Sequence, residues 1–368
     1  MENEMNKKNI TIASLSFLMF NSTVANAGKD IKKGELEVVA SLDIRPGNVT
    51  VSDDGRVFAT IHPFDRPSRW RLIEITGKTS WKAWPDDSWQ KNEDQTLSHQ
   101  IDTPIGITRD AQNRLWLVDM GLNSGKTRIL SFDINTGKHL MTIELDDSVA
   151  PQGSFIQDLV VDAHAGWIYL ADISNPGLIT VNIASKISNR FSGHPSLQSE
   201  RSAVMHIDGQ NILFNGKPAS VAVNPITLTA DGKTLFFGAM NGTTWYGIDT
   251  EYLQKADDKV IAQHIRNVGK KPVSDGAAIS SQGRHYFTNL NNNGVDMMDK
   301  EGKLIPLVRS ALIDWPDSIQ FGDKQWLYIS ANQLHRTAMF TGNADKGEAP
   351  YRILRVWTDD TQPYTSNK

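Results

Sequence analysis

One pattern of apolar and polar positions recurs along the chain: a short apolar strand, a turn rich in Asp, Gly or Asn, and a second strand that carries aromatic residues. The pattern occurs over residues 48–61, 105–120, 157–173, 226–240, 277–290 and 318–331. The distance from one occurrence to the next suits a four-stranded unit with its loops. Short strands joined by such turns predict an all-β fold made of repeated units.

Further short segments between the repeats alternate in polarity and are rich in β-branched side chains. They are residues 71–76, 128–134, 177–183 and 352–357. No long segment keeps the 3.6-residue apolar period of a helix. Six units therefore predict a six-bladed β-propeller, in which radial repetition leaves only short protected edges. Residues 35–44 precede the first repeat without a partner there, so we expect them to supply the outer strand of the last blade.

The N-terminal residues have the three parts of a secretory signal peptide: a basic start, an apolar stretch over residues 10–20, and small residues before Gly28. We predict a signal peptide over residues 1–27, cleaved after Ala27, and a single propeller domain over residues 28–368. The chain is then secreted or periplasmic. The apolar stretch has about half of the ~20 residues that a spanning helix needs, so we expect no integral membrane anchor.

Composition narrows the range of partners. Hydrophobic residues make up 39% of the 368 residues and mean hydropathy is -0.38, as in a globular protein with a large core. The net charge of -4 and the absence of basic runs exclude a nucleic-acid footprint, so small molecules or proteins are the expected partners. The chain has no cysteine, which excludes zinc-thiolate sites, iron–sulfur clusters and cysteine nucleophiles.

Several runs resemble the Yellow/major royal jelly protein family. They are SFIQDLVVDAHAGWIYLADISNPGLITVNI (154–183), RFSGHPSL (190–197), IDGQNILFNGKPASVAVNPITLTADGKTLFFGAMNGTTWYGI (207–248) and SDGAAISSQGRHYFTNLNNNGVDMMD (274–299). The resemblance implies a secreted six-bladed propeller, in agreement with the repeat count. Members of the family are linked to pigment metabolism, including dopachrome tautomerase activity, or to nutritional and ligand-binding roles. Because fold does not dictate activity, function depends on the residues of the site.

The starts of the innermost strands converge on the central channel of a propeller. Counting from the turns places these residues near one mouth: Asn48, Ile105, Asp158, Asn224, Asp275 and Asp317. Carboxylate and amide oxygens suit Ca²⁺ or Mg²⁺. Three Asp side chains in one volume also repel each other unless a cation or shared protons offset their charge. The structural alternative is that Asp and Asn bond to nearby backbone at strand entries, where they are common.

A more distant resemblance strengthens the case for a metal. The runs NPITLTADGKTLFF and SDGAAISSQGRHYF resemble blades of gluconolactonase-type calcium lactonases, whose ion is held by a Glu, two Asn and an Asp. The resemblance implies that Asn224 and Asp275 are metal ligands, with calcium as the cofactor. Blade one has Pro46 or Gly47 where the Glu is expected, and blade two has Ile105 in place of the other Asn. Half of that ligand set is absent.

Histidine offers acid–base chemistry without a metal. A tautomerase moves a proton from carbon to oxygen, which a His or a carboxylate with a pKa near working pH can do. His194 and His206, in the long loop between blades three and four, are the candidate catalytic residues together with Asp158. The alternative is that each His only bonds to backbone. His62 and His335 each follow a repeat strand and are outside candidates.

In three repeats a Trp follows the turn directly, but Trp245 does not occupy that position. It is therefore a candidate to contact a flat aromatic ligand, with Asn48 and Asp317 as further ligand-binding residues. Three functions remain open. The first is an exported propeller that binds, and isomerises as a dopachrome tautomerase does, a small molecule at the channel mouth. The second is a calcium-assisted lactone hydrolase. The third is a non-catalytic protein whose Trp-containing loops meet a protein partner. The first is our working hypothesis.

Overall fold

The structure is a computed structural model, and it describes residues 31–64, 69–91, 99–255 and 257–363. The chain divides into two compact units, Met1–Ile31 and Lys32–Lys368. The predicted signal peptide lies outside the described residues, and every described strand belongs to the second unit. Within the described residues, none of the helices has the length and the apolar character needed to cross a lipid bilayer.

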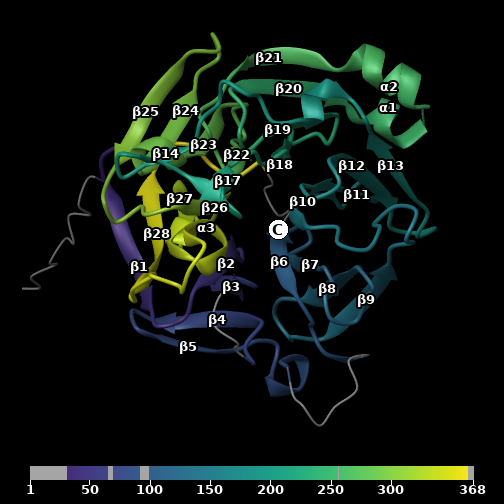
Figure 1. Cartoon of the computed structure of the whole chain (residues 1–368). Coiled ribbons are helices and arrows are strands. Elements are labelled where there is room, and N and C mark those ends of the chain that lie inside the picture. The colour runs from purple at the N-terminus through teal and green to yellow at the C-terminus, as the bar shows by residue number, and fades with distance from the viewer. Residues whose placement is uncertain (1–30, 65–68, 92–98, 256, 364–368) are drawn as a thin grey trace, which may run out of the picture. The chain divides into compact units, whose positions relative to one another are not determined.

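Six four-stranded antiparallel sheets surround a central axis in the second unit (Figure 1). The prediction of an all-β, six-bladed β-propeller is therefore confirmed. Blade one contains β2 (Pro46–Val51), β3 (Val57–Ile61), β4 (Leu72–Gly77) and β5 (Ser80–Ala83). Blade two contains β6 (Pro104–Arg109), β7 (Arg114–Asp119), β8 (Arg128–Asp133) and β9 (His139–Glu144). Blade three contains β10 (Ile156–Asp162), β11 (Trp167–Asp172), β12 (Gly177–Asn182) and β13 (Ser188–Ser192).

The remaining blades carry the insertions. Blade four contains β18 (Val223–Leu228), β19 (Thr234–Ala239), β20 (Thr244–Asp249) and β21 (Arg266–Lys270). Blade five contains β22 (Ala277–Ile279), β23 (His285–Asn289), β24 (Gly294–Met298) and β25 (Leu304–Arg309). Blade six contains β26 (Pro316–Phe321), β27 (Trp326–Ala331), β28 (Tyr351–Trp357) and β1 (Leu36–Leu42). The short helices α1 (Thr250–Lys255) and α2 (Asp258–His264) interrupt blade four, and α3 (Ala338–Thr341) follows β27 in blade six.

Blade six joins the two ends of the described chain. β1 pairs antiparallel with β28, from Leu36 opposite Val356 to Leu42 opposite Tyr351. The expectation that residues 35–44 supply the outer strand of the last blade is thus confirmed. Apolar clusters fill the spaces between neighbouring blades, and β-branched and aromatic residues on the alternating faces of each strand form them.

Five of the six innermost strands have a bulge or register shift at their entry. In β2, β6, β18 and β26 two residues face a single residue of the second strand; in blade one, for example, Gly47 and Asn48 lie opposite Thr60. In β10 the register shifts at Gln157. A bulge kinks the strand and re-aims its side chains. Two successive residues of each inner strand can therefore both reach the channel, one toward each mouth.

A polar insertion lies over one mouth. Between blades three and four the chain forms two small hairpins, β14 (His206–Ile207) with β15 (Gln210–Asn211) and β16 (Leu213–Phe214) with β17 (Lys217–Pro218). Residues of this insertion pack with Trp315, Leu334 and Phe340 of blade six in one apolar cluster. The insertion therefore forms a cap that leans on blade six.

Candidate functional site

Aligning the blades on their bulges separates the channel residues into two layers. The first layer consists of Gly47, Ile105, Gln157, Asn224, Asp275 and Asp317. The second layer consists of Asn48, Gly106, Asp158, Pro225, Gly276 and Ser318. The expectation of one ring therefore needs correction, because Asn48 and Asp158 stand one residue beyond the others. Counting from the turns misplaces residues because the turn Asp does not occupy the same position in every blade. Asp162 is the last residue of β10, whereas Asp231 lies in the turn after β18.

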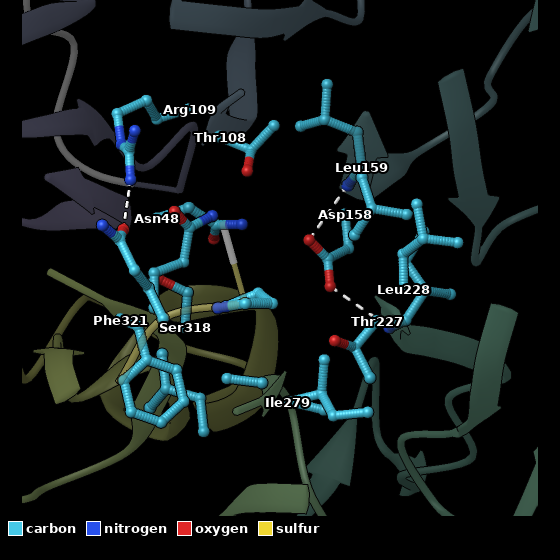
Figure 2. A pocket seen from close by; sticks show the side chains of 18 residues that line it. Asn48, Thr108, Arg109, Asp158, Leu159, Thr227, Leu228, Ile279, Ser318 and Phe321 are labelled. Carbon is cyan, nitrogen blue, oxygen red and sulfur yellow. Dashed lines mark hydrogen bonds between the residues drawn. The ribbon is translucent and has the colours of Figure 1, made fainter. Parts of the chain in front are cut away.

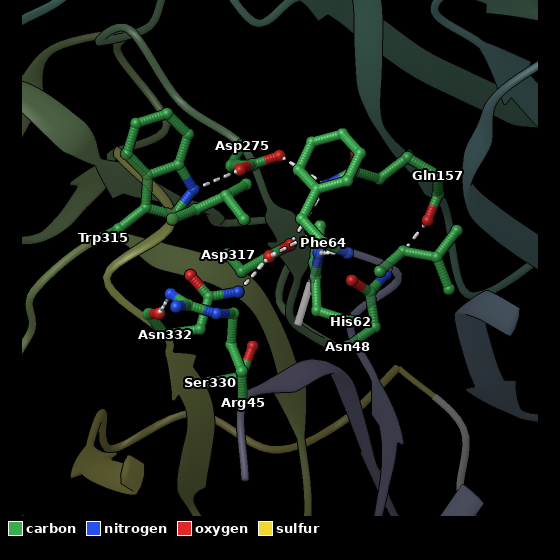
Figure 3. A network of polar contacts seen from close by, with 12 residues as sticks. Arg45, Asn48, His62, Phe64, Gln157, Asp275, Trp315, Asp317, Ser330 and Asn332 are labelled. Carbon is green, nitrogen blue, oxygen red and sulfur yellow. Dashed lines mark hydrogen bonds and ion pairs between the residues drawn. The ribbon is translucent and has the colours of Figure 1, made fainter. Parts of the chain in front are cut away.

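Gln157 bridges two carboxyl groups from different blades at the centre of the first layer (Figure 3). Its Nε2 donates to Oδ1 of Asp275 at 2.8 Å and to Oδ1 of Asp317 at 3.0 Å. Asp275 also accepts a hydrogen bond from Trp315 Nε1 at 2.8 Å and one from Asn224 Nδ2. Sequence reasoning placed Asn224, Asp275 and Asp317 together, and the structure does so. It missed Gln157, although the step QD in blade three is equivalent to NP, DG and DS in blades four, five and six.

Burial controls the charge of this centre. It raises the pKa of Asp317 to about 7. The pKa of Asp275 lies well above its usual range, because of burial first and then the nearby charge of Asp317. Burial, followed by the charge of Arg45, lowers the pKa of His62 to about 3. Near neutral pH the centre thus holds a neutral imidazole and carboxyl groups that retain protons.

His62 follows β3 and points at Asp317 (Figure 3). The backbone N–H of Phe64 donates to His62 Nδ1 at 3.1 Å, so the neutral ring carries its hydrogen on Nε2. That Nε2 lies 3.8 Å from Oδ2 of Asp317 and is buried, with no hydrogen-bond partner among the residues that the structure describes. An unpaired buried N–H is costly unless a ligand or water accepts from it. His62, an outside candidate from sequence, is therefore the histidine that the structure brings to the channel.

A cavity of about 210 Å³ lies at this mouth, between the first layer and the cap. Its apolar lining residues are Phe64, Phe155, Ile173, Phe214, Val221, Met240, Trp315, Leu334 and Phe340. Its polar lining residues are His62, Gln157, Ser174 and Ser220. His62, Gln157 and Trp315 each contact a carboxyl group behind the lining. An apolar wall with a few convergent polar groups is the usual form of a small-molecule site.

A smaller cavity of about 70 Å³ lies at the opposite mouth (Figure 2). Second-layer residues Asn48, Asp158 and Ser318 line it, together with residues that follow them in the inner strands. The 210 Å³ cavity is instead lined by residues that precede the inner strands, such as Phe155 and Trp315, so the two cavities lie at opposite ends of the channel. Burial raises the pKa of Asp158 to about 8.

The other predicted site residues lie away from both cavities. His194 caps a short 3-10 helix, where its Nδ1 accepts from Ser196 N at 3.2 Å. His206 is exposed on the insertion, 2.9 Å from Asn211 Oδ1. Trp245 is fully buried between blades four and five, with its ring 5.1 Å from that of Phe287. A Trp in the third strand of a blade packs between blades, so the channel does not reach it.

One group of side chains outside the channel has spacing suited to a metal. Among the described residues, Asp208, Asp314 and His335 place ligand atoms within 4.8 Å of one another. Arg336 already lies there, with Nη2 2.9 Å from Asp314 Oδ2 and Nε donating to His335 Nε2 at 3.3 Å. The guanidinium supplies the positive charge. This group therefore ties the β14–β15 turn of the cap to blade six.

The first layer fits a calcium ion only in part. Asn224 Oδ1 and Asn332 Oδ1 are buried acceptors to which no described residue donates, beside the carboxyl groups of Asp275 and Asp317. Such oxygens suit Ca²⁺, which takes about 6–8 of them. Asp275, however, already accepts hydrogen bonds from three side chains. Blades one and two contribute no oxygen-bearing side chain at this level, because Gly47 and Ile105 stand there.

Known proteins share this architecture. Virginiamycin B lyase from Staphylococcus aureus matches with a TM-score of 0.52 and 16% identity, over 88% of this chain and 98% of that one. A gluconolactonase from Xanthomonas campestris matches with a TM-score of 0.55 and 13% identity, over 88% and 89% of the two chains. At such identities the likeness shows the fold alone.

The sequence comparisons identify the family. Major royal jelly protein 6 of Apis mellifera is 22% identical over 229 residues, which cover 58% of this chain. The match spans half the length (50%) of that relative. Residues 103–365, well over half of the chain, match the family described as Major royal jelly protein. The chain therefore belongs to the major royal jelly protein family.

Proposed function

We propose that this exported propeller binds a small molecule with one polar edge in the 210 Å³ cavity and catalyses its isomerisation, as a dopachrome tautomerase does. The observation that carries the proposal is the floor of the cavity, where His62 and Gln157 face the ligand and the carboxyl groups of Asp317 and Asp275 stand behind them. The aromatic wall supports a flat ligand, because aromatic rings pack by offset or edge contacts.

The floor has the two properties that a proton shift needs. His62 Nε2–H has no partner within the described residues, so it is placed to donate to a ligand oxygen and to stabilise negative charge on it. Asp317, 3.8 Å behind that nitrogen, has its pKa raised to about 7 by burial, which suits exchange of protons near neutral pH. An isomerisation consumes no net proton: the proton that leaves the ligand carbon is taken by a base, for which the ionised fraction of Asp317 is the available group, and an equal proton is delivered to the ligand oxygen.

Dopachrome tests this proposal. His62→Ala should lower turnover, followed as loss of the visible absorbance of dopachrome, by about 100-fold, in the range usual for a lost acid–base or oxyanion group. The matched control is His194→Ala, which removes an imidazole remote from the channel. Unchanged turnover in His62→Ala would contradict the proposed role. Quenching of tryptophan fluorescence by dopachrome measures binding separately from turnover.

A second candidate function is calcium-assisted hydrolysis of a lactone, favoured by the unpartnered Oδ1 atoms of Asn224 and Asn332. Asn224, Asp275, Asp317 and Asn332 are the residues that would hold the ion, which when bound polarises a carbonyl group. Metal analysis of the purified protein decides the matter. Stoichiometric calcium that is lost in Asp275→Ala, together with lactone turnover, supports this function, whereas metal-free protein of full thermal stability excludes it.

A further inference from the structure

Asp158 stands in the smaller cavity, where only backbone groups of the described residues bond to it. The residue is half-buried in the channel wall, and its carboxylate accepts from the backbone N–H groups of Leu159 at 2.9 Å and Ile226 at 3.2 Å. Among the described residues, no Lys or Arg side chain forms an ion pair with it. A charge withdrawn from bulk water is costly unless it is paired or coordinates a metal. The side chain therefore needs either a proton or a cation at this place.

Asn48 supplies a second acceptor to the same cavity. The side chain is 4% exposed, and its Nδ2 donates to the carbonyl oxygen of Gln157 at 3.0 Å. Because a carbonyl oxygen only accepts, this bond fixes the amide orientation. Asn48 Oδ1 then has no hydrogen-bond partner in the described part of the chain. Gln157 directly precedes Asp158 in β10, so this bond holds Asn48 against the strand that carries the carboxylate.

The side chains of Gln320 and Arg109, which line this cavity, already donate to other partners. Gln320 Nε2 donates to the carbonyl oxygen of Ile107 at 2.8 Å. Arg109 Nη1 lies 2.6 Å from Asp53 Oδ1, and Arg109 Nη2 donates to Gln362 Oε1 (Figure 2). The acceptors Asp158 and Asn48 keep spare capacity, so the cavity presents oxygen atoms to any occupant.

We propose that this cavity is a binding site for a small, hard metal cation, held by the Asp158 carboxylate and Asn48 Oδ1 and completed by water. Oxygen ligands of this kind suit Ca²⁺, which tolerates irregular sets of charged and neutral donors. A volume of about 70 Å³ holds an ion with a few waters, since one water needs about 10–15 Å³. It is a third of the volume of the cavity under the cap, which suits an ion better than an organic molecule. Gln362 and Pro363 line the mouth beside it.

The site is independent of the proposed function. Gln157 and the first layer separate it from the 210 Å³ cavity, and neither Asp158 nor Asn48 lines that cavity. It also differs from the calcium candidate at Asn224 and Asp275, which belongs to the first layer. Substitutions in one layer can therefore serve as controls for substitutions in the other.

The experiment is thermal unfolding of the full chain at pH 8.5, with CaCl₂, MgCl₂ or NaCl compared with choline chloride at equal ionic strength. We expect CaCl₂ to raise the unfolding midpoint of the wild type by roughly 3–5 °C at 100-fold excess over Kd. Asp275→Asn should keep this rise, and Asp158→Asn, which imitates the protonated side chain, should lose it. A rise caused by NaCl and lost in Asp158→Asn supports a monovalent occupant of the same site.

A gain-of-function variant makes the test independent of the stability of Asp158→Asn. Asn48→Asp adds a second carboxylate, which should lower the CaCl₂ concentration needed for the same rise at least tenfold, because ligand charge tunes affinity. The matched control is Asn241→Asp, an equally buried amide outside the channel. The proposal is overturned if no salt raises the wild-type midpoint, or if Asp158→Asn shows the same rise as the wild type.

Discussion

The two mouths of the channel are built from consecutive residues of the same inner strands, yet their polar groups are paired in different ways. At the mouth under the cap, Gln157 donates to Asp275 and Asp317, and Trp315 donates to Asp275 as well. At the opposite mouth Asp158 receives only backbone N–H groups, and Asn48 Oδ1 receives none. Side-chain N–H groups therefore donate to the carboxyl groups at the capped mouth, whereas among the described residues only backbone N–H groups donate to the carboxyl group at the opposite mouth.

This difference shows that adjacent residues of a bulged strand can line different cavities. Gln157 and Asp158 are adjacent in sequence, but one serves the large cavity and the other the small one. A bulge lets neighbouring residues serve separate sites because it breaks the strict alternation of a strand. The chemistry of a propeller channel therefore varies residue by residue, and not only blade by blade.

Gln157→Glu should have the largest effect, because it removes the donor that distinguishes the capped mouth. The new carboxylate faces Asp275 and Asp317 with no N–H to offer, so we expect a loss of about 3 kcal/mol or more in unfolding free energy at pH 8. The loss should shrink at pH 5, where the group is more readily protonated. Urea unfolding at both pH values measures it, with exposed Gln112→Glu as control. Equal losses in the two variants would contradict the bridging role.

The pH dependence of stability sharpens the comparison. Asp158 and Asp317 have folded pKa values of about 8 and 7 against a usual 3.8, so the folded state holds protons that the unfolded state has lost. The contribution of these two groups to the unfolding free energy is thus fully present near pH 4 and is lost as pH rises through about 7 for Asp317 and about 8 for Asp158. In chelator-treated protein, the difference between wild type and Asp158→Asn should therefore still change between pH 7 and 8, whereas the difference between wild type and Asp317→Asn should change mainly below pH 7. Urea unfolding from pH 5 to 9 would show either outcome.

Phe214→Ala tests the wall that only the capped mouth possesses. Phe214 lies on the insertion with its ring 5.1 Å from that of Phe340, and both rings line the large cavity. We expect about a tenfold loss of affinity for a bound aromatic probe such as dopachrome, and a loss of about 1 kcal/mol in stability because the ring is half-buried. The adjacent exposed Leu213→Ala is the matched control. Calcium-dependent stabilisation at the opposite mouth should be unchanged in both.

Asp208→Asn should have the smallest effect. Asp208 lies 3.6 Å from His335 Nε2 and 3.8 Å from Arg336 Nη2, and its side chain is more than half exposed. Exposed ion pairs contribute about 0.2–1 kcal/mol. Global stability should therefore barely change, while amide hydrogen exchange of residues 199–222 becomes faster because the cap is less firmly held. Asp231→Asn, in an exposed turn of blade four, should leave that exchange unchanged.

The fold was predictable because the signal is repeated. Six apolar strand pairs, each with its turn, carry the same information, and residues 35–44 had no partner other than the last blade. The helices α1 and α2 were not predicted. With six and seven residues, they are too short to show a helical period within blade four.

The candidate site was predictable only where it belongs to the repeat. Asn224, Asp275 and Asp317 come from equivalent inner-strand positions and were placed together correctly. Asn332 follows β27 and His62 follows β3, so neither occupies the position at which the repeats were compared. Their convergence depends on how loops return over the channel mouth, which strand periodicity does not contain.

The pairing of β1 with β28 makes the order of the blades circular. Residues 43–45 link β1 of blade six to β2 of blade one, as peptide linkers join the other neighbouring blades, and the hydrogen bonds between β1 and β28 complete blade six. No blade therefore differs from the others by having a free side, and the ring is closed only when all six blades pack together. A circular permutant opened between the exposed residues His164 and Ala165, with the present ends of the described chain linked, should close the same ring, because this turn lies within blade three and away from the β1–β28 pairing.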